Sequence, residues 1–393
     1  MIPSYYEFYN PVKIISGNNA LDNLNYEIDL LGVRKPFLIT DQGIIKAGLL
    51  KHIENAFIKT KKHISVFDKV PTDSSIDVIN ELANIIRESE SDCLIALGGG
   101  SVIDTAKAVN ILISENSHDI MEFGGADHLK KPLKPLIAIP TTTGTGSEMT
   151  GVAVIKDSYR KMKLGFSSQF LMPRLAIIDP RMTITLPPFL TAATGIDALT
   201  HAIESYYCIQ KNPMSDIFAW KAIELISTNL IYVVRNPTDK NGKLALANAA
   251  CMAGISLANS LAGVIHALGH AIGSVCDIPH GVAMNIFLPL GLEYNIKKVG
   301  HIIGELIFPL AGSKVSQKIP EKERPLEVVK FIYALRNQLY ELVKLPRTLK
   351  EANITKDKLE EIANIAINDG SILFNPEEIE YVDALELLDK AYE

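Results

Sequence analysis

The chain has 393 residues, a net charge of −6 and a composition that is 47% hydrophobic and 21% charged, which is typical of a globular protein with two domains. Its basic residues form no stripe interleaved with aromatic side chains, which argues against a nucleic-acid partner. The four cysteines lack a C-x-x-C pair, and the N-terminus has no basic segment followed by an apolar one, so we expect reduced thiols and a cytoplasmic protein without an export signal.

Short apolar runs alternate with helical patterns through the first half of the chain. The runs are apolar at consecutive positions rather than at every second one, which is typical of strands covered on both faces. Strands that alternate with helices in this way predict a parallel sheet. The predicted strands are 36–40, 92–97, 135–140 and 175–180, and the helical patterns between them include 44–57 and 101–113.

The second half of the chain, after Pro187 and Pro188, consists of long helical patterns. We therefore expect an α/β domain over 1–185 and an all-helical domain over 186–393. The stretch 244–276 has no Asp, Glu, Lys or Arg and is long enough to cross a membrane. Its asparagine, serine and histidine residues and its many alanines favour a buried helix or helix pair instead, so we expect no membrane partner.

A glycine turn follows the strand at 92–97. Gly98, Gly99 and Gly100 would let the backbone approach a ligand closely, and Ser101 is placed to act as the N-cap of the next helix. The free N–H groups and positive dipole end of that helix would face the ligand, which is typically a phosphate. The spacing matches neither G-x-G-x-x-G nor the Walker A motif, so this loop alone does not identify a nucleotide site.

A second loop, 139–148, follows the strand at 135–140 and offers the hydroxyl groups of Thr141, Thr142, Thr143 and Thr145 beside two glycines. Ligands of open α/β sheets bind beyond the carboxyl ends of the strands, where both loops are expected, so together they favour a nucleotide site. Asp41 also closes a strand and could accept hydrogen bonds from a ribose 2′-hydroxyl; a simple turn residue is an equally good interpretation at this point.

The second half concentrates histidines in an otherwise apolar region. Asp197 and His201 are four positions apart, as are His266 and His270, and His280 follows a proline. At that spacing in a helix, each pair shares one face. A single buried histidine is usually a core residue, but burying several imidazoles and a carboxylate without partners would cost several kcal/mol, and a divalent cation removes that cost.

The donor set of carboxylate and imidazole suits Fe²⁺, Zn²⁺ or a neighbouring metal and does not choose among them. Five candidate side chains are more than the four protein ligands that such a site usually takes. One histidine would therefore be left over, and it could move protons instead of binding the metal.

These segments resemble the iron-containing (group III) alcohol dehydrogenase family, and the resemblance covers essentially the whole chain. It is carried by "GGGSVIDTAK", "PTTTGTGSE", "GIDALTHAIESY", "HALGHAIGSVCDIPHGVAMNIFLP" and "FNPEEIEYVDALELLDKAYE". The resemblance implies a dehydroquinate-synthase-like architecture: an α/β dinucleotide-binding domain with a parallel sheet, followed by an all-helical metal-binding domain. It also implies an NAD-dependent oxidoreductase that interconverts a primary alcohol and its aldehyde, usually as a homodimer or larger homo-oligomer.

The resemblance also implies roles for individual residues. Asp197, His201, His266 and His280 match the family's ligands for Fe²⁺, with Zn²⁺ as the alternative, and His270 matches a histidine proposed to relay protons. The family's cofactor positions fall into three groups. One is an acid that is present in NAD-dependent rather than NADP-dependent members, the second is the pyrophosphate loop, and the third is the region around the nicotinamide ribose. The matching residues are Asp41, Gly99, Gly100, Ser101, Thr141, Thr142, Thr145 and Lys163, beside Gly98 of the glycine turn.

Some assignments stay open at the level of sequence. Asp104 and Lys107 recur in the glycine-loop motif without a clear role, and the segment 70–75 departs from the family pattern near the adenine. A glycerol-dehydrogenase-like polyol dehydrogenase is one alternative function, and a metal-dependent hydrolase or lyase on the same scaffold is another. The substrate itself is not identified beyond a small alcohol or aldehyde.

Overall fold

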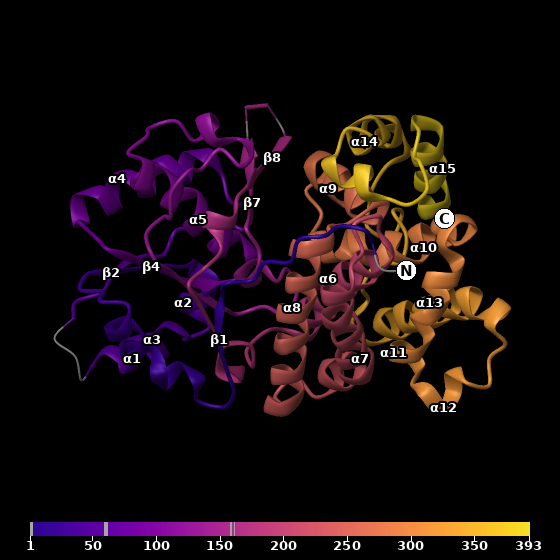
Figure 1. Cartoon of the computed structure of the whole chain (residues 1–393), viewed down its shortest axis with the longest axis horizontal. Coiled ribbons are helices and arrows are strands. Elements are labelled where there is room, and N and C mark those ends of the chain that lie inside the picture. Colours follow the sequence, from indigo (N-terminus) through magenta and orange to yellow (C-terminus); the bar gives the residue numbers. More distant parts are fainter. Residues whose placement is uncertain (1–2, 59–61, 158, 161) are drawn as a thin grey trace. The chain divides into compact units, whose positions relative to one another are not determined.

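The computed structural model describes residues 3–58, 62–157, 159–160 and 162–393, which form two compact units (Figure 1). One unit is Asn10–Leu186. The other combines Met1–Tyr9 with Pro187–Glu393. The predicted domains divide the chain after residue 185, whereas the compact units also place the residues before Asn10 with the helical part.

A parallel sheet of six strands forms the centre of the first unit. It contains the four predicted strands together with two short strands that the sequence pattern did not reveal. In spatial order the strands are β1 (Lys13–Ser16), β9 (Leu175–Ile178), β6 (Leu136–Pro140), β4 (Cys93–Gly98), β2 (Pro36–Ile39) and β3 (Ser65–Phe67).

The central strands are buried on both faces, which explains their uninterrupted apolar sequences. In β4, Leu94 and Ala96 belong to one hydrophobic cluster, and Ile95 and Leu97 belong to another, because successive side chains of a strand point to opposite faces. Helices α4 and α5 contribute to the first cluster, and α1 and α3 contribute to the second. The helices of this unit are α1 (Leu24–Leu30), α2 (Gln42–Lys46), α3 (Leu50–Phe57), α4 (Ile76–Ser89) and α5 (Gly100–Glu115).

A second, smaller sheet was not predicted. It has three strands, β5 (Gly125–Ala126), β8 (Met162–Ser167) and β7 (Val152–Asp157), of which β7 and β8 are antiparallel. Side chains of β7 alternate between buried and half-buried positions. The prediction looked for continuous apolar runs, and an alternating strand of this kind lacks that signal.

The second unit is all-helical among the residues that the structure describes, and one continuous hydrophobic cluster fills its centre. Together with the parallel sheet of the first unit, this confirms the predicted fold class. The helices are α6 (Pro188–Tyr207), α7 (Pro213–Arg235), α8 (Lys240–Ser260), α9 (Val264–Cys276), α10 (His280–Glu305), α11 (Ile307–Ala311), α12 (Ser313–Ser316), α13 (Arg324–Val343), α14 (Leu359–Ala366) and α15 (Tyr381–Tyr392).

Helices α8 and α9 form the helix pair predicted for 244–276, and they meet at a bend of 104°. By length and composition alone, this pair taken as one span, and helix α7 by itself, are apolar enough to cross a membrane. The same apolar character is what a packed helix core requires. Ile223, Ile226 and Leu230 of α7 are indeed fully buried in the central cluster.

Candidate metal and dinucleotide sites

Asp197 and His201 lie on one face of α6, near the middle of the helical unit. The helix begins at Pro188, where a proline is tolerated because its missing N–H would have no partner in the first turn. The two residues are four positions apart, so their side chains lie one helical turn apart on the same face of the helix. Asp197 is 3% exposed and His201 is 5% exposed, so this carboxylate and imidazole are both held in the protein interior.

The other histidines come from α9 and α10. His266 and His270 are one turn apart on α9, and His280 is the first residue of α10. The next residue, Gly281, lies so close to α6 that a Cβ atom there would stand 2.2 Å from the carbonyl oxygen of Ala193. A glycine is therefore needed for α10 to begin beside α6, which brings His280 to Asp197.

Four of the five candidate ligands converge on one point. Asp197, His201, His266 and His280 each offer a ligand atom, and all four atoms lie within 4.8 Å of one another. The Oδ1 atom of Asp197 is 3.7 Å from Nε2 of His201 and 3.4 Å from Nε2 of His280. His270 stands outside this group, and its ring stacks on His280 with 5.3 Å between the ring centroids.

The unsatisfied atoms of this cluster fit a cation. Among the residues that the structure describes, Asp197 Oδ1 and His266 Nε2 are buried and have no hydrogen-bond partner. Burial raises the pKa of Asp197 to about 7 and holds the pKa of His266 well below its usual value. Burying such atoms is costly unless they are paired. A divalent metal bound by neutral imidazoles and a carboxylate would supply the missing partner.

Two further carboxylates contact the histidines and were missed by the sequence analysis. Glu204, fully buried on α6, makes a short hydrogen bond through Oε2 with Nδ1 of His266. Asp369 places Oδ2 at 2.9 Å from Nδ1 of His270. Burial alone would raise the pKa of Asp369, but the hydrogen bonds from His270 and Ser371 hold it below its ordinary value. Glu204 follows His201 by three positions, a helical spacing that could have revealed it, whereas Asp369 has no such local signal.

The loops predicted to bind a dinucleotide meet at one edge of the six-stranded sheet. Strands β2, β4 and β6 are neighbours and parallel, so their carboxyl ends lie side by side. Asp41 follows β2, the glycine turn ends β4, and Thr141 follows β6, where its N–H donates to the carbonyl of Gly98 at 3.0 Å. Such an edge is where open α/β sheets bind ligands.

The glycine and threonine loops are in direct contact. A Cβ atom on Gly99 would lie 3.1 Å from Cγ2 of Thr142, and one on Gly100 would lie 2.7 Å from Cγ2 of Thr145. Only residues without a side chain leave room for this approach. The prediction that Ser101 is the N-cap of α5 is wrong: the helix begins at Gly100 with Gly99 as its N-cap, because the chain turns directly out of β4.

Ser101 and Lys163 are instead linked through the segment that departs from the family pattern. The hydroxyl of Ser101 donates to the carbonyl of Thr72, and Nζ of Lys163 lies 3.6 Å from Oδ1 of Asp73. Asp41 accepts a hydrogen bond from the N–H of Ile44 at 2.9 Å and so caps α2. The residues proposed for cofactor binding therefore come from several elements of this unit.

Asp104 and Lys107, both on α5, form hydrogen bonds with the end of the threonine loop. The Lys107 side chain is fully buried, and its three N–H donors share five oxygen atoms within hydrogen-bond distance of Nζ, which belong to Ser147, Thr150 and Val152. Asp104 accepts from the Ser147 hydroxyl at 2.6 Å. These bonds tie the end of the threonine loop and the residues that follow it to α5, the helix that begins at the glycine turn.

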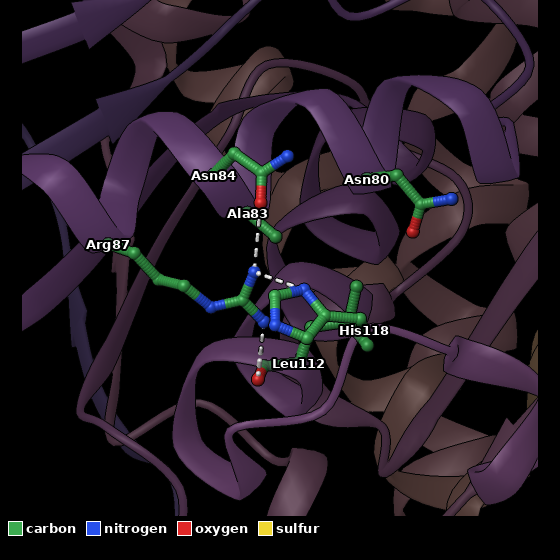
Figure 2. Close-up of a pocket in the computed structure, with 6 residues that line it drawn as sticks. All are labelled: Asn80, Ala83, Asn84, Arg87, Leu112 and His118. Atoms are coloured by element: carbon green, nitrogen blue, oxygen red, sulfur yellow. Dashed lines mark hydrogen bonds between the residues drawn. The ribbon is translucent and has the colours of Figure 1, made fainter.

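A pocket on the surface of α4 and α5 is separate from these loops (Figure 2). It lies beside Leu112, near the C-terminal end of α5, whereas the glycine turn is at the N-terminal end. Arg87 is one of the residues that line it, and its guanidinium donates to Asn84 at 3.0 Å and to the carbonyl of Leu112 at 3.2 Å (Figure 2). This guanidinium satisfies carbonyls at the end of the helix and is explained by that structural role.

Comparison with known proteins relates both units to one family. The profile described as "Iron-containing alcohol dehydrogenase" matches residues 11–180, and the profile described as "Fe-containing alcohol dehydrogenase family, C-terminal" matches residues 191–392. The chain is 32% identical over 388 residues to alcohol dehydrogenase 4 of Saccharomyces cerevisiae, covering 98% of each protein. It is also 32% identical over 318 residues to an NAD-dependent methanol dehydrogenase of Bacillus methanolicus, covering 79% of this chain and 83% of that protein.

The solved structures include the alcohol dehydrogenase from Oenococcus oeni, which superimposes with a TM-score of 0.94 at 29% sequence identity. The superposition covers 99% of this chain and 100% of that protein. The likeness therefore extends over nearly the full length of both proteins.

Proposed function

The chain belongs to the iron-containing alcohol dehydrogenase family, and from this premise we propose that it interconverts a small primary alcohol and its aldehyde with NAD(H) and a bound divalent metal. The observation that carries the proposal is the convergence of Asp197, His201, His266 and His280 within 4.8 Å. A buried carboxylate and three imidazoles in this arrangement have no structural purpose that apolar side chains would not serve better.

We assign the metal to these four residues. Fe²⁺ is the ion named by the family, and Zn²⁺ suits the same nitrogen and oxygen donors. When bound, the metal acts as a Lewis acid on the substrate oxygen, and NAD⁺ accepts the hydride. Helix α6 fixes the positions of Asp197 and His201 relative to each other. Both side chains are buried, so water is excluded from this part of the site.

We assign the dinucleotide to the carboxyl edge of the six-stranded sheet. The backbone N–H groups of the glycine turn and the N-terminal end of α5 would bind the pyrophosphate. Asp41 would accept hydrogen bonds from the adenosine ribose and repel a 2′-phosphate, which favours NAD over NADP. The residues assigned to the cofactor are Asp41, Gly98, Gly99, Gly100, Ser101, Thr141, Thr142, Thr145 and Lys163.

We assign proton transfer to His270. Asp369 accepts from Nδ1, which leaves Nε2 as the proton-accepting atom of the ring. The side chain of His270 is 30% exposed, so it can exchange a proton with solvent while it stacks on His280. A histidine with one nitrogen bound by a carboxylate and the other free to accept is a suitable general base for an alcohol proton.

We further propose a cytoplasmic homodimer. Strand β1 lies at the edge of the six-stranded sheet, and Ile14 on it is 40% exposed. An exposed edge strand can pair with another chain, which supports assembly through the N-terminal segment. The scattered cysteines and their lack of disulfides among the described residues support a reducing compartment.

The function is tested by loading the purified chain anaerobically with Fe²⁺ or with Zn²⁺. We expect NADH to form, by its absorbance, when NAD⁺ and a panel of short primary alcohols and diols are supplied. Thorough chelation and His280→Ala should both abolish the signal. His301→Ala, an exposed histidine on the same helix α10, is the matched control and should leave it unchanged.

Failure of every alcohol to yield NADH, and of every matching aldehyde to consume it, would contradict the proposal. Metal-dependent hydrolysis of a nucleotide without any change in NADH would favour the hydrolase instead.

A further inference from the structure

Helix α9, which carries His266 and His270, begins without a cap of its own. Its N-cap residue is Gly263, which has no side chain to accept from the first N–H groups of the helix. Unpaired N–H groups at a buried helix end are costly, so other segments must supply acceptors. Asn375 accepts from the N–H of Val264 at 3.2 Å, and Glu204 accepts from the N–H of Ile265 at 2.9 Å.

Glu204 therefore contacts both the backbone and a side chain of α9. Its Oε1 atom is committed to the backbone N–H of Ile265, a donor that cannot reverse its role. Its Oε2 atom is in a short hydrogen bond with Nδ1 of His266. Burial raises the pKa of Glu204 to about 7, and backbone N–H donors such as that of Ile265 oppose this rise and favour the carboxylate. As a carboxylate Glu204 only accepts, so Nδ1 carries the proton, and a neutral imidazole has only one. The Nε2 atom of His266 then keeps its lone pair, and it is one of the buried atoms without a hydrogen-bond partner in the described part of the chain.

We infer that Glu204 is a positioning residue that fixes the tautomer of His266, so that Nε2 is presented as a metal ligand. This inference rests on the metal site of the proposed function and adds the residue that prepares it before any ion arrives. Because the same carboxylate caps α9, the ring orientation and the start of the helix are set by one side chain. Carboxylates behind ligand histidines commonly fix ring orientation and basicity in metal sites.

The substitution Glu204→Gln separates this role from simple packing, because it changes the chemistry and keeps the shape. The glutamine oxygen must face the N–H of Ile265, since the alternative places two donors against each other. The amide NH₂ group then faces Nδ1 of His266, which has to become the acceptor. The ring proton then moves to Nε2, so Nε2 no longer offers a lone pair to the metal. To bind the ion, the imidazole has to give up its hydrogen bond with the glutamine amide.

The test measures Zn²⁺ affinity by competition with a chromophoric chelator, together with the ¹⁵N spectrum of His266 in the metal-free full chain. We expect Nδ1–H in the wild type, Nε2–H in Glu204→Gln and Zn²⁺ affinity that is roughly 10- to 100-fold weaker in the variant. Tyr207→Phe is the matched control, because it removes a hydroxyl 3.4 Å from Oε1 of Glu204 while the carboxylate keeps both of its other partners.

The control should keep the wild-type tautomer and bind Zn²⁺ as tightly as the wild type. A wild-type spectrum with the proton on Nε2 would overturn the inference even if Glu204→Gln failed to fold. So would a folded Glu204→Gln variant that binds Zn²⁺ like the wild type. NADH formation by the loaded wild type tests the dehydrogenase function separately, so a shifted tautomer without dehydrogenase activity would leave this inference standing.

Discussion

The Nδ1 atom of His270 lies 2.9 Å from Oδ2 of Asp369, although the two residues are 99 positions apart in the chain. The other oxygen of Asp369 accepts from the N–H of Ser371 at 2.8 Å, at the start of the short helix Gly370–Phe374. The carboxylate is therefore held on one side by a backbone donor and orients the histidine on the other.

This relationship predicts a kinetic effect of Asp369→Asn. The amide oxygen should face Ser371, which leaves the NH₂ group against Nδ1 and moves the ring proton of His270 to Nε2. We expect kcat to fall by on the order of tenfold, less than the roughly 10²- to 10⁴-fold contribution of a general acid–base group that His270→Ala would remove. Steady-state kinetics with NAD⁺ and an active alcohol measure both. Equal rates for Asp369→Asn and the wild type would contradict the role of Asp369.

We expect Asp41 to set the preference for NAD⁺ over NADP⁺. Asp41→Ser keeps a side-chain oxygen that can cap α2 and removes the negative charge, so its effect on stability should be small. We expect kcat/KM for NADP⁺ to rise by about tenfold or more, because repulsion of the 2′-phosphate is relieved. Asp119→Ser, which alters a capping aspartate of a different helix in the same unit, is the control and should leave the preference for NAD⁺ unchanged.

We expect Lys107 to affect both the stability of the fold and cofactor binding, because it supports the threonine loop. Lys107→Met keeps the length of the side chain but leaves the carbonyls of Ser147, Thr150 and Val152 without this donor. Unsatisfied buried carbonyls cost about 1–3 kcal/mol each, so we expect a loss of about 3 kcal/mol in the free energy of unfolding. The KM for NAD⁺ should also rise. Urea unfolding measures the loss of stability and steady-state kinetics measure the KM. An unchanged KM would show that the support from Lys107 does not affect cofactor binding.

We expect the carboxylate of Asp179 to stabilise the fold at neutral pH and to lose this contribution in acid. Burial alone would raise its pKa, but the Arg181 side chain and the N–H groups of Leu21 and Arg181 hold the pKa below its ordinary value. A carboxyl group with a lowered folded-state pKa stabilises the fold above its unfolded-state pKa of about 3.9 and loses that contribution as the pH falls through the folded-state value. Asp179→Asn should therefore cost about 2 kcal/mol at pH 7.

The difference between Asp179→Asn and the wild type should be constant at and above about pH 5 and shrink below about pH 4. Urea unfolding at several pH values measures it. Asp22→Asn, at the exposed second partner of Arg181, should have a much smaller effect at every pH. A gap that widens on acidification would show that the carboxylate of Asp179 does not stabilise the fold.

Several features of the fold followed from local sequence. The strands Pro36–Ile39 and Cys93–Gly98 have no polar side chain because both of their faces are covered, and a strand of that kind is recognisable without its neighbours. Strand β7 alternates instead, and it was missed. Ser101 was misplaced because the start of a helix depends on how the chain leaves the preceding strand, which here turns at Gly99.

Local spacing was enough to predict which residues share a helix face: Asp197 with His201, and His266 with His270, since helical geometry relates residues four apart wherever the helix lies. The packing of distant segments brings His280 to Asp197, His201 and His266 and leaves His270 beside them. It also places Glu204 and Asp369 against the two histidines of α9. These contacts join segments 62 and 99 residues apart, and their geometry is set by how the helices pack, which no local spacing encodes.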